Sequence, residues 1–127
     1  MMTRTDRPNE PGDLVLVNLE PALGTEQRGT RPAIIISTIE MNTLTQRVVI
    51  CPITNNTRYW PSKVLLPGGL AARGAILVDQ VRSIDRHARI LRFIGTVPEA
   101  VLAEVRAKLA ALVGISLTSD AQRGENA

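Results

Sequence analysis

The chain is poor in the residues that build disulfides and metal sites. It has one cysteine, Cys51, and one histidine, His87. A single cysteine cannot form an internal disulfide, and neither a metal site nor a Cys–His or His–Asp site can be assembled around these residues. We therefore expect no metal and no cofactor. Cys51 is expected to pack as a small apolar side chain, and His87 to lie in a surface turn.

Aromatic residues and long apolar runs are also scarce. Tyr59, Trp60 and Phe93 are the only aromatic residues of the chain, so the core must be aliphatic. No apolar run approaches the ~20 residues needed to span a bilayer. The polar segment of residues 1–11 lacks the apolar region of a secretory signal. These absences favour a cytoplasmic protein without membrane contact.

Positive charge is plentiful and is carried almost entirely by arginine. Lysine plus arginine number 15 against 12 acidic residues in the 127-residue chain, and the net charge is +3. Only Lys63 and Lys108 are lysines. The planar guanidinium matches phosphate and carboxylate oxygens with two parallel donors, so this bias favours an anionic ligand.

Length and patterning indicate a single domain with polar ends. Hydrophobic residues make up 44% of the chain, enough for a core. Residues 1–11 are expected to be a flexible arm and residues 116–127 a disordered tail, because neither has hydrophobic periodicity. The folded domain is expected to span residues 12–115.

Six short runs rich in β-branched residues predict strands, because Gly, Pro and Asn bound them. They are Asp13–Leu19, Pro32–Ser37, Arg47–Ile53, Ser62–Leu66, Ala75–Ile84 and Arg89–Thr96. Their close spacing favours antiparallel pairing into a small barrel or a strongly twisted sheet. Alternation along Ala75–Ile84 would place Gln80 and Arg82 on one face. Asp79 would lie on the other face, paired with an arginine.

One helix is predicted near the C-terminus. Thr96 and Glu99 have the spacing of a capping box, Glu104 and Lys108 form an i,i+4 pair, and Gly114 suits a left-handed stop. One stripe of apolar residues would face the sheet: Val101, Val105, Leu109, Leu112 and Val113. The fold class is therefore mainly β with a C-terminal helix.

Two segments concentrate side chains that could bind an anion or a base. The loop of residues 20–32 contains Glu26, Gln27, Arg28 and Arg31. The segment that follows the third predicted strand contains Thr54, Asn55, Asn56 and Arg58. Such groups suit phosphate oxygens and base edges. From composition alone, a solvated hairpin tip and an Asn/Thr turn explain the two segments equally well.

Four strings in order resemble the MazF/PemK toxins, sequence-selective endoribonucleases of type II toxin–antitoxin systems. The strings are GDLV (12–15), EQRGTRPA (26–33), CPIT (51–54) and VDQVR (78–82). The resemblance covers about residues 12–115. It implies a small SH3-like barrel of the MazF/CcdB/Kid type, a homodimer, and a cognate acidic antitoxin as partner.

The resemblance also implies a reaction and its residues. Family members cleave single-stranded RNA without a metal, through attack of the 2′-hydroxyl, leaving a 2′,3′-cyclic phosphate and a 5′-hydroxyl. The family's catalytic arginine and threonine correspond to Arg31 and Thr54. Arg31 suits the charge that develops on phosphate oxygens, and because an arginine pKa above about 12 makes a poor base, Glu26 is the candidate base. The expected RNA contacts are Gln27, Arg28, Asn55, Asn56, Arg58, Trp60, Gln80 and Arg82.

The sequence departs from the family pattern at two places. Thr25 stands where many relatives have serine, and residues 59–62 differ from the common Tyr-Pro-Phe pattern. The recognised RNA sequence therefore cannot be carried over. Trp60 either stacks on a base or packs against the barrel.

Two other functions are alternatives: a non-enzymatic gyrase poison like CcdB, and a plain nucleic-acid-binding barrel. The pairing of Arg31 with Thr54 favours the ribonuclease.

Overall fold

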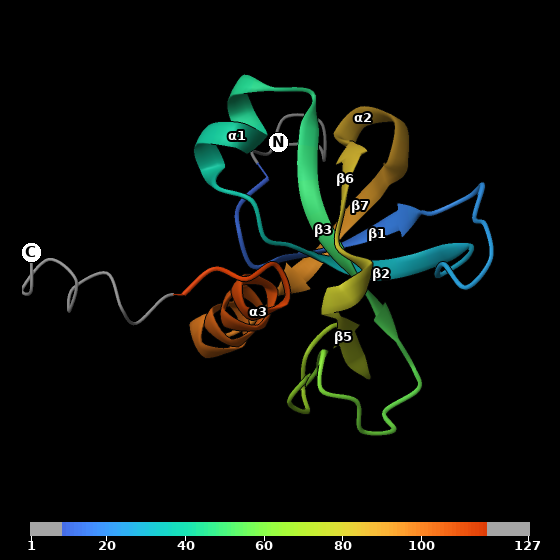
Figure 1. Ribbon diagram of the computed structural model, residues 1–127. Helices are drawn as coiled ribbons and strands as arrows, with labels where there is room; N and C mark the ends of the chain where they lie inside the picture. The colour runs from blue at the N-terminus through green and yellow to red at the C-terminus, as the bar shows by residue number, and fades with distance from the viewer. Residues whose placement is uncertain (1–8, 117–127) are drawn as a thin grey trace, which may run out of the picture.

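The computed structural model describes residues 9–116, so most of the expected arm and tail lies outside the described residues (Figure 1). The elements, in chain order, are β1 (Asp13–Asn18), β2 (Thr30–Ile35), α1 (Ile39–Leu44), β3 (Arg47–Thr54), β4 (Lys63–Leu65), β5 (Ala75–Leu77), the 3-10 helix η1 (Val78–Gln80), β6 (Arg82–Asp85), α2 (Arg86–Arg89), β7 (Ile90–Thr96) and α3 (Glu99–Leu112).

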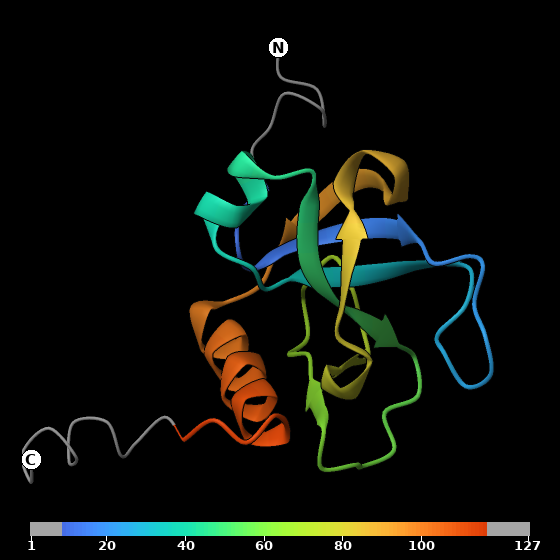
Figure 2. The same ribbon diagram turned by 45° about the horizontal axis from the view of Figure 1, so that its top comes forward.

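The strands form one antiparallel sheet in which β3 has the central place. The order is β4-β5-β3-β2-β1-β7, and β6 pairs with the first half of β3. The sheet twists strongly, with α3 on one side and the β1–β2 loop projecting from the opposite side (Figure 2). The path ends at β4 and β7, so the sheet stays open and the expected barrel does not close.

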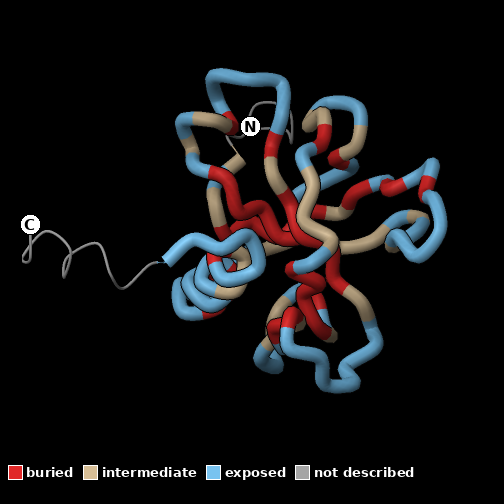
Figure 3. The backbone as a smooth tube through the Cα atoms, in the orientation of Figure 1, coloured by how far each residue is buried: buried red, intermediate tan, exposed pale blue. Residues whose placement is uncertain are grey.

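The core is aliphatic, as the scarcity of aromatic residues predicts. One cluster packs under α3 and includes Leu14, Ile34 and Val105, and a second lies on the other face of the sheet and includes Val15 and Ile35. Neighbouring residues of β1 and β2 thus alternate between the two clusters, as strand geometry requires. The buried backbone runs through the middle of the strands, and most loops are exposed (Figure 3).

Cys51 is fully buried in the first cluster, which confirms that it packs as a small apolar side chain. Burial raises the pKa of its thiol to about 12, and the negative charge of Asp79 adds to the shift. The thiol therefore stays protonated at neutral pH and offers no nucleophile.

Helix α3 starts and packs differently from the prediction. Its N-cap is Pro98 and no side chain caps it, so the predicted capping box is wrong, because Thr96 is the last residue of β7. Val105 is buried as expected, but Leu112 and Val113 are 51% and 60% exposed. Val101, Val105 and Leu109 therefore pack on the core cluster, whereas the last two residues of the predicted stripe do not.

The end of α3 agrees with the prediction. Gly114 has a φ of 81°, and the Ile115 N–H donates to the Ala110 carbonyl at 2.7 Å. This pattern closes a helix C-terminus with a left-handed residue. The i,i+4 pair is also present, with Lys108 Nζ 3.8 Å from a Glu104 oxygen.

The predicted strand Ala75–Ile84 is wrong, because the structure divides it into β5, η1 and β6. The Val81 N–H donates to the Val78 carbonyl at 3.2 Å, which turns the chain at Val78–Gln80. Asp79 is exposed in this turn and makes no ion pair within residues 9–116, so the expected Asp–Arg pair is not formed. A polar residue in a turn needs no buried partner.

Two short helices were not predicted. In α1, Asn42 is fully buried and its Nδ2 donates to the Asn9 carbonyl at 2.8 Å. In α2, the Asp85 carboxylate accepts from the Ala88 and His87 N–H groups, and the Ala88 bond above all lowers the pKa of Asp85. His87 is exposed on α2, so its surface position is confirmed. Elements of six and four residues are too short to show hydrophobic periodicity.

Gly74 lets the segment before β5 approach the end of β3, and this close approach is testable. It has a φ of +117°, and a Cβ there would lie 2.0 Å from the Thr54 carbonyl oxygen. Gly69 has a φ of +87°, with nothing within 4 Å of a Cβ. We expect Gly69→Ala to lower the free energy of unfolding by about 1–2 kcal/mol, from backbone strain alone. Gly74→Ala should cost about 4 kcal/mol or more.

Urea denaturation measures both losses. Because the two variants add the same methyl group at a positive φ, the difference between them isolates the contact with Thr54. Equal losses would contradict the close approach.

Candidate functional site

The β1–β2 loop is organised by the Glu20 carboxylate at its base. Its oxygens accept from the Gly29 N–H at 2.7 Å and the Ala22 N–H at 3.4 Å, and lie 3.8 Å from Arg28. From α2, Arg89 donates to the Glu20 carbonyl at 2.8 Å. The loop is thus built around its own backbone and fixed to a neighbouring helix.

Gln80 of η1 fixes the loop from the other side. Its Oε1 accepts from the Gln27 N–H at 2.7 Å, and its Nε2 lies 3.5 Å from the Thr25 carbonyl. Gln80 was predicted to contact RNA. In the structure its side-chain amide bonds to the loop backbone at Gln27 and Thr25.

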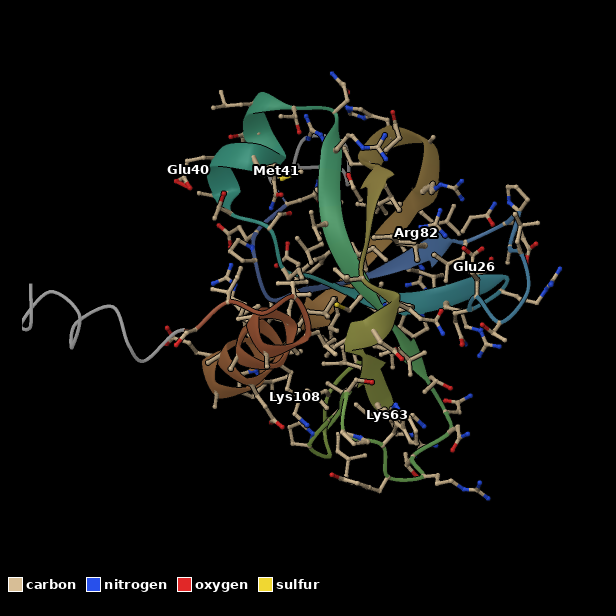
Figure 4. The ribbon with its side chains drawn as sticks, in the orientation of Figure 1. Glu26, Glu40, Met41, Lys63, Arg82 and Lys108 are labelled. Carbon is tan, nitrogen blue, oxygen red and sulfur yellow. The ribbon has the colours of Figure 1, made fainter. Side chains whose placement is uncertain are left out.

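A cavity of about 510 Å³ lies between this loop and η1. Its lining brings together residues from four parts of the chain: Leu19, Thr25, Glu26, Gln27, Pro52, Asp79, Gln80, Val81 and Arg82. Figure 4 shows Glu26 and Arg82 on the same side of the ribbon. Of the predicted site residues, the cavity therefore joins Glu26, Gln27, Gln80 and Arg82.

Two carboxylates line this cavity. Glu26 Oε1 accepts from the Leu23 N–H at 2.8 Å, which fixes the carboxylate within the loop. Asp79 comes from η1 and has no ion pair in the described part of the chain. Sequence reasoning gave Asp79 only a structural role, because it placed Asp79 inside a strand. The sequence feature that points to Asp79 as a residue of the site is its place beside Gln80 in the VDQVR string.

Arg31 and Thr54 lie at one end of the β2–β3 pair. The register pairs Ala33 with Pro52, and Arg31 and Thr54 are each two residues beyond that pair. Pro52 lines the cavity, but neither Arg31 nor Thr54 is part of its lining. Of the three predicted catalytic residues, the structure thus places Glu26 in the cavity wall, and Arg31 and Thr54 two residues along their strands from the Ala33–Pro52 pair.

Both side chains are held by local backbone groups. Arg31 Nε donates to the Arg28 carbonyl at 3.0 Å, and the guanidinium makes no ion pair within residues 9–116. Thr54 Oγ1 accepts from the Asn56 N–H at 3.2 Å. The remaining guanidinium N–H groups of Arg31 and the hydroxyl of Thr54 can donate hydrogen bonds to phosphate oxygens.

The β3–β4 loop carries the other predicted RNA contacts. Asn55, Asn56, Arg58 and Trp60 are all exposed, and Trp60 is 60% exposed. Trp60 lines a second hollow of about 400 Å³, together with Asp79 and residues of α3. Because Asp79 lines both hollows, the two candidate binding regions adjoin.

Residues 9–116 contain neither a cluster of metal-ligating side chains nor a membrane-spanning helix. No group of three or more His, Cys, Asp or Glu side chains there is arranged to hold a metal ion. No helix in that range is long and apolar enough to cross a bilayer.

Comparison with known proteins identifies the family. A family model described as PemK-like, MazF-like toxin of type II toxin–antitoxin system matches residues 10–113. The chain belongs to this family. It is 37% identical over 103 residues to the endoribonuclease toxin MazF of Escherichia coli K12, covering 81% of this chain and 92% of that protein.

Solved structures give the same result for the fold. MazF from Deinococcus radiodurans is similar with a TM-score of 0.80 and 39% identity, covering 87% of this chain and all of that one. A MazE–MazF structure from the same organism has a TM-score of 0.75 and 34% identity, with the same coverage. The predicted fold class, mainly β with a C-terminal helix, is therefore confirmed as that of the MazF toxins.

Proposed function

We propose that the protein is the toxin of a type II toxin–antitoxin system and an endoribonuclease that cuts single-stranded RNA at specific sequences. One observation carries the proposal: Arg31, near the start of β2, and Thr54, at the end of β3, each stand two residues beyond the Ala33–Pro52 pair, and Pro52 lines the cavity that Glu26 and Asp79 also line. That arrangement supplies hydrogen-bond donors for a phosphate group and a carboxylate that can accept a proton. A curated relative named as an endoribonuclease supports it.

The proposed reaction needs no metal. The 2′-oxygen bonds to the adjacent phosphorus, the bond from phosphorus to the 5′-oxygen breaks, and a 2′,3′-cyclic phosphate and a 5′-hydroxyl result. Arg31 stabilises the negative charge on the phosphate oxygens and stands as proton donor to the leaving oxygen, and Thr54 adds one hydrogen bond. A carboxylate of the cavity takes the 2′-proton. Glu26 is the candidate from the sequence, and the structure adds Asp79.

The remaining predicted contacts supply the RNA surface. Arg28, Arg58 and Arg82 are cations suited to the RNA backbone, while Asn55, Asn56 and Gln27 present amide groups. Trp60 is exposed beside a hollow, where a base can stack on it. Gln80 contributes by holding Gln27 in place.

We also propose an acidic antitoxin as a partner, bound across the basic surface so that it covers the active-site loop. The solved MazE–MazF structure of a similar chain supports this partner. In this proposal both proteins act in the cytoplasm, where mRNA is the substrate, and growth stops because translation is inhibited.

The exposed apolar residues at the end of α3 favour a homodimer. Leu112, Val113 and Ile115 are each more than half exposed, and such patches are covered when two copies associate. Light scattering should give twice the 13.8 kDa of one chain. A monomer throughout the micromolar range would contradict the dimer.

The reaction can be tested with RNA that lacks one hydroxyl. Purified protein should cut a long RNA into discrete fragments in the presence of EDTA, and a deoxyribose at the scissile position should abolish cutting while binding persists.

Arg31→Ala should lower the cleavage rate about a hundredfold or more, about 3 kcal/mol, and Thr54→Val should lower it somewhat less. Arg31→Lys should restore little, because a point charge lacks the paired donors. RNA binding without cleavage would instead support a plain binding protein.

The proton acceptor can be identified by two isosteric variants. Glu26→Gln and Asp79→Asn each remove one carboxylate from the cavity and keep its shape. The variant that removes the base should lose most of the cleavage rate and the acid limb of its pH–rate profile, whereas the other should keep that limb. If both variants keep the acid limb, neither carboxylate is the base.

A further inference from the structure

The two lysines of this arginine-rich chain share one structural task. Lys108 Nζ, on α3, donates to the Pro61 carbonyl at 3.0 Å and the Lys63 carbonyl at 2.9 Å. Lys63 Nζ donates in turn to the Asn56 carbonyl at 2.9 Å and the Arg58 carbonyl at 3.1 Å. Both ammonium groups are therefore bonded to the backbone of the β3–β4 segment, and they follow one another from the helix to the loop (Figure 4).

The chain of bonds ends at the candidate catalytic threonine. Asn56, whose carbonyl accepts from Lys63, donates its N–H to Thr54 Oγ1 at 3.2 Å. The Asn56 Oδ1 accepts from the Arg58 N–H at 3.0 Å. The two carbonyls that Lys63 holds thus belong to Asn56 and Arg58, which are proposed to contact RNA, and Lys108 holds the backbone on either side of Ser62.

The chemistry of an ammonium group suits this arrangement. It has three donors and no acceptor, and it can bond two carbonyls of an irregular loop that cannot pair with each other. Such charge-assisted bonds are stronger than neutral ones. Without them the exposed segment of residues 55–61 would be restrained mainly by its own turns, and loops with few restraints sample several conformations.

We propose that Lys63 and Lys108 form a two-lysine relay that holds the β3–β4 loop in the conformation that selects the RNA sequence. The inference rests on the proposed ribonuclease function and concerns the specificity of that site. Both lysines act as positioning residues, since each acts through loop backbone. Lys108 also borders the hollow that Trp60 and Asp79 line, so the relay lies next to the candidate site.

The relay can be removed by Lys63→Met and Lys108→Met, which keep an unbranched side chain and delete the ammonium group. Arg106→Met is a matched control, because Arg106 is a cation of the same helix that donates to a backbone carbonyl, that of Ile36, at 2.8 Å, away from the loop. Lys108→Arg is the conservative variant, which keeps donors at the same place.

The first measurement uses Trp60, the only tryptophan of the chain, as a reporter within the loop. Lys63→Met and Lys108→Met should each change its fluorescence and increase its quenching by acrylamide. Arg106→Met should leave both unchanged, and Lys108→Arg should stay close to the unaltered protein. Unchanged Trp60 signals in both methionine variants would overturn the relay.

The second measurement compares cleavage rates at many sites of one long RNA. The methionine variants should change the ratio of rates between preferred and poor sites by about tenfold, mainly through KM, while Arg106→Met keeps the ratio. An equal loss at every site would show that the lysines act only as charges on the phosphate backbone, and would overturn the proposal. If the unaltered protein cuts no RNA, the proposed function fails, while the Trp60 measurement still decides whether the relay holds the loop.

Discussion

The pairing of β3 with three other strands is the constraint on which the site depends. Its first half pairs with β6, its middle with β2 and its end with β5. Because antiparallel register fixes which residues are opposite each other, Arg31 of β2 and Thr54 of β3 each stand two residues beyond the last pair, Ala33 and Pro52. Gly74 allows the segment before β5 to reach the same point. The positions of the two proposed catalytic residues thus follow from sheet register rather than from loop conformation.

The two loops that flank this pair are held by side chains that donate to or accept from their backbone. Gln80 and Arg89 hold the β1–β2 loop, and Lys63 and Lys108 hold the β3–β4 loop. Each bond spans elements that are distant in sequence or starts from a rigid element. Polar side chains that look like ligand groups in a sequence therefore divide into those that hold a loop and those that face the ligand.

The sequence predicts the strands well because β-branched runs and their Gly, Pro and Asn boundaries are local signals. It fails at Ala75–Ile84, where an apolar run continues through a turn, and only the tertiary position of η1 reveals the break. Asp79 was assigned to a structural ion pair for that reason. The prediction of a capping box at Thr96 is wrong for a similar reason, because Thr96 is the last residue of β7.

The site shows the same division between local and tertiary information. Arg31, Thr54 and Glu26 are candidates that strings of consecutive residues supply, because a resemblance carries residue positions directly. The bonds of Gln80 to Gln27 and of Lys108 to the Lys63 carbonyl join residues 53 and 45 positions apart, and no short string contains them. Such long-range bonds depend on where a helix packs. For this reason the composition of a loop shows which groups are suited to contact RNA, whereas the packing of η1 and α3 decides which of them are instead bonded to the protein itself.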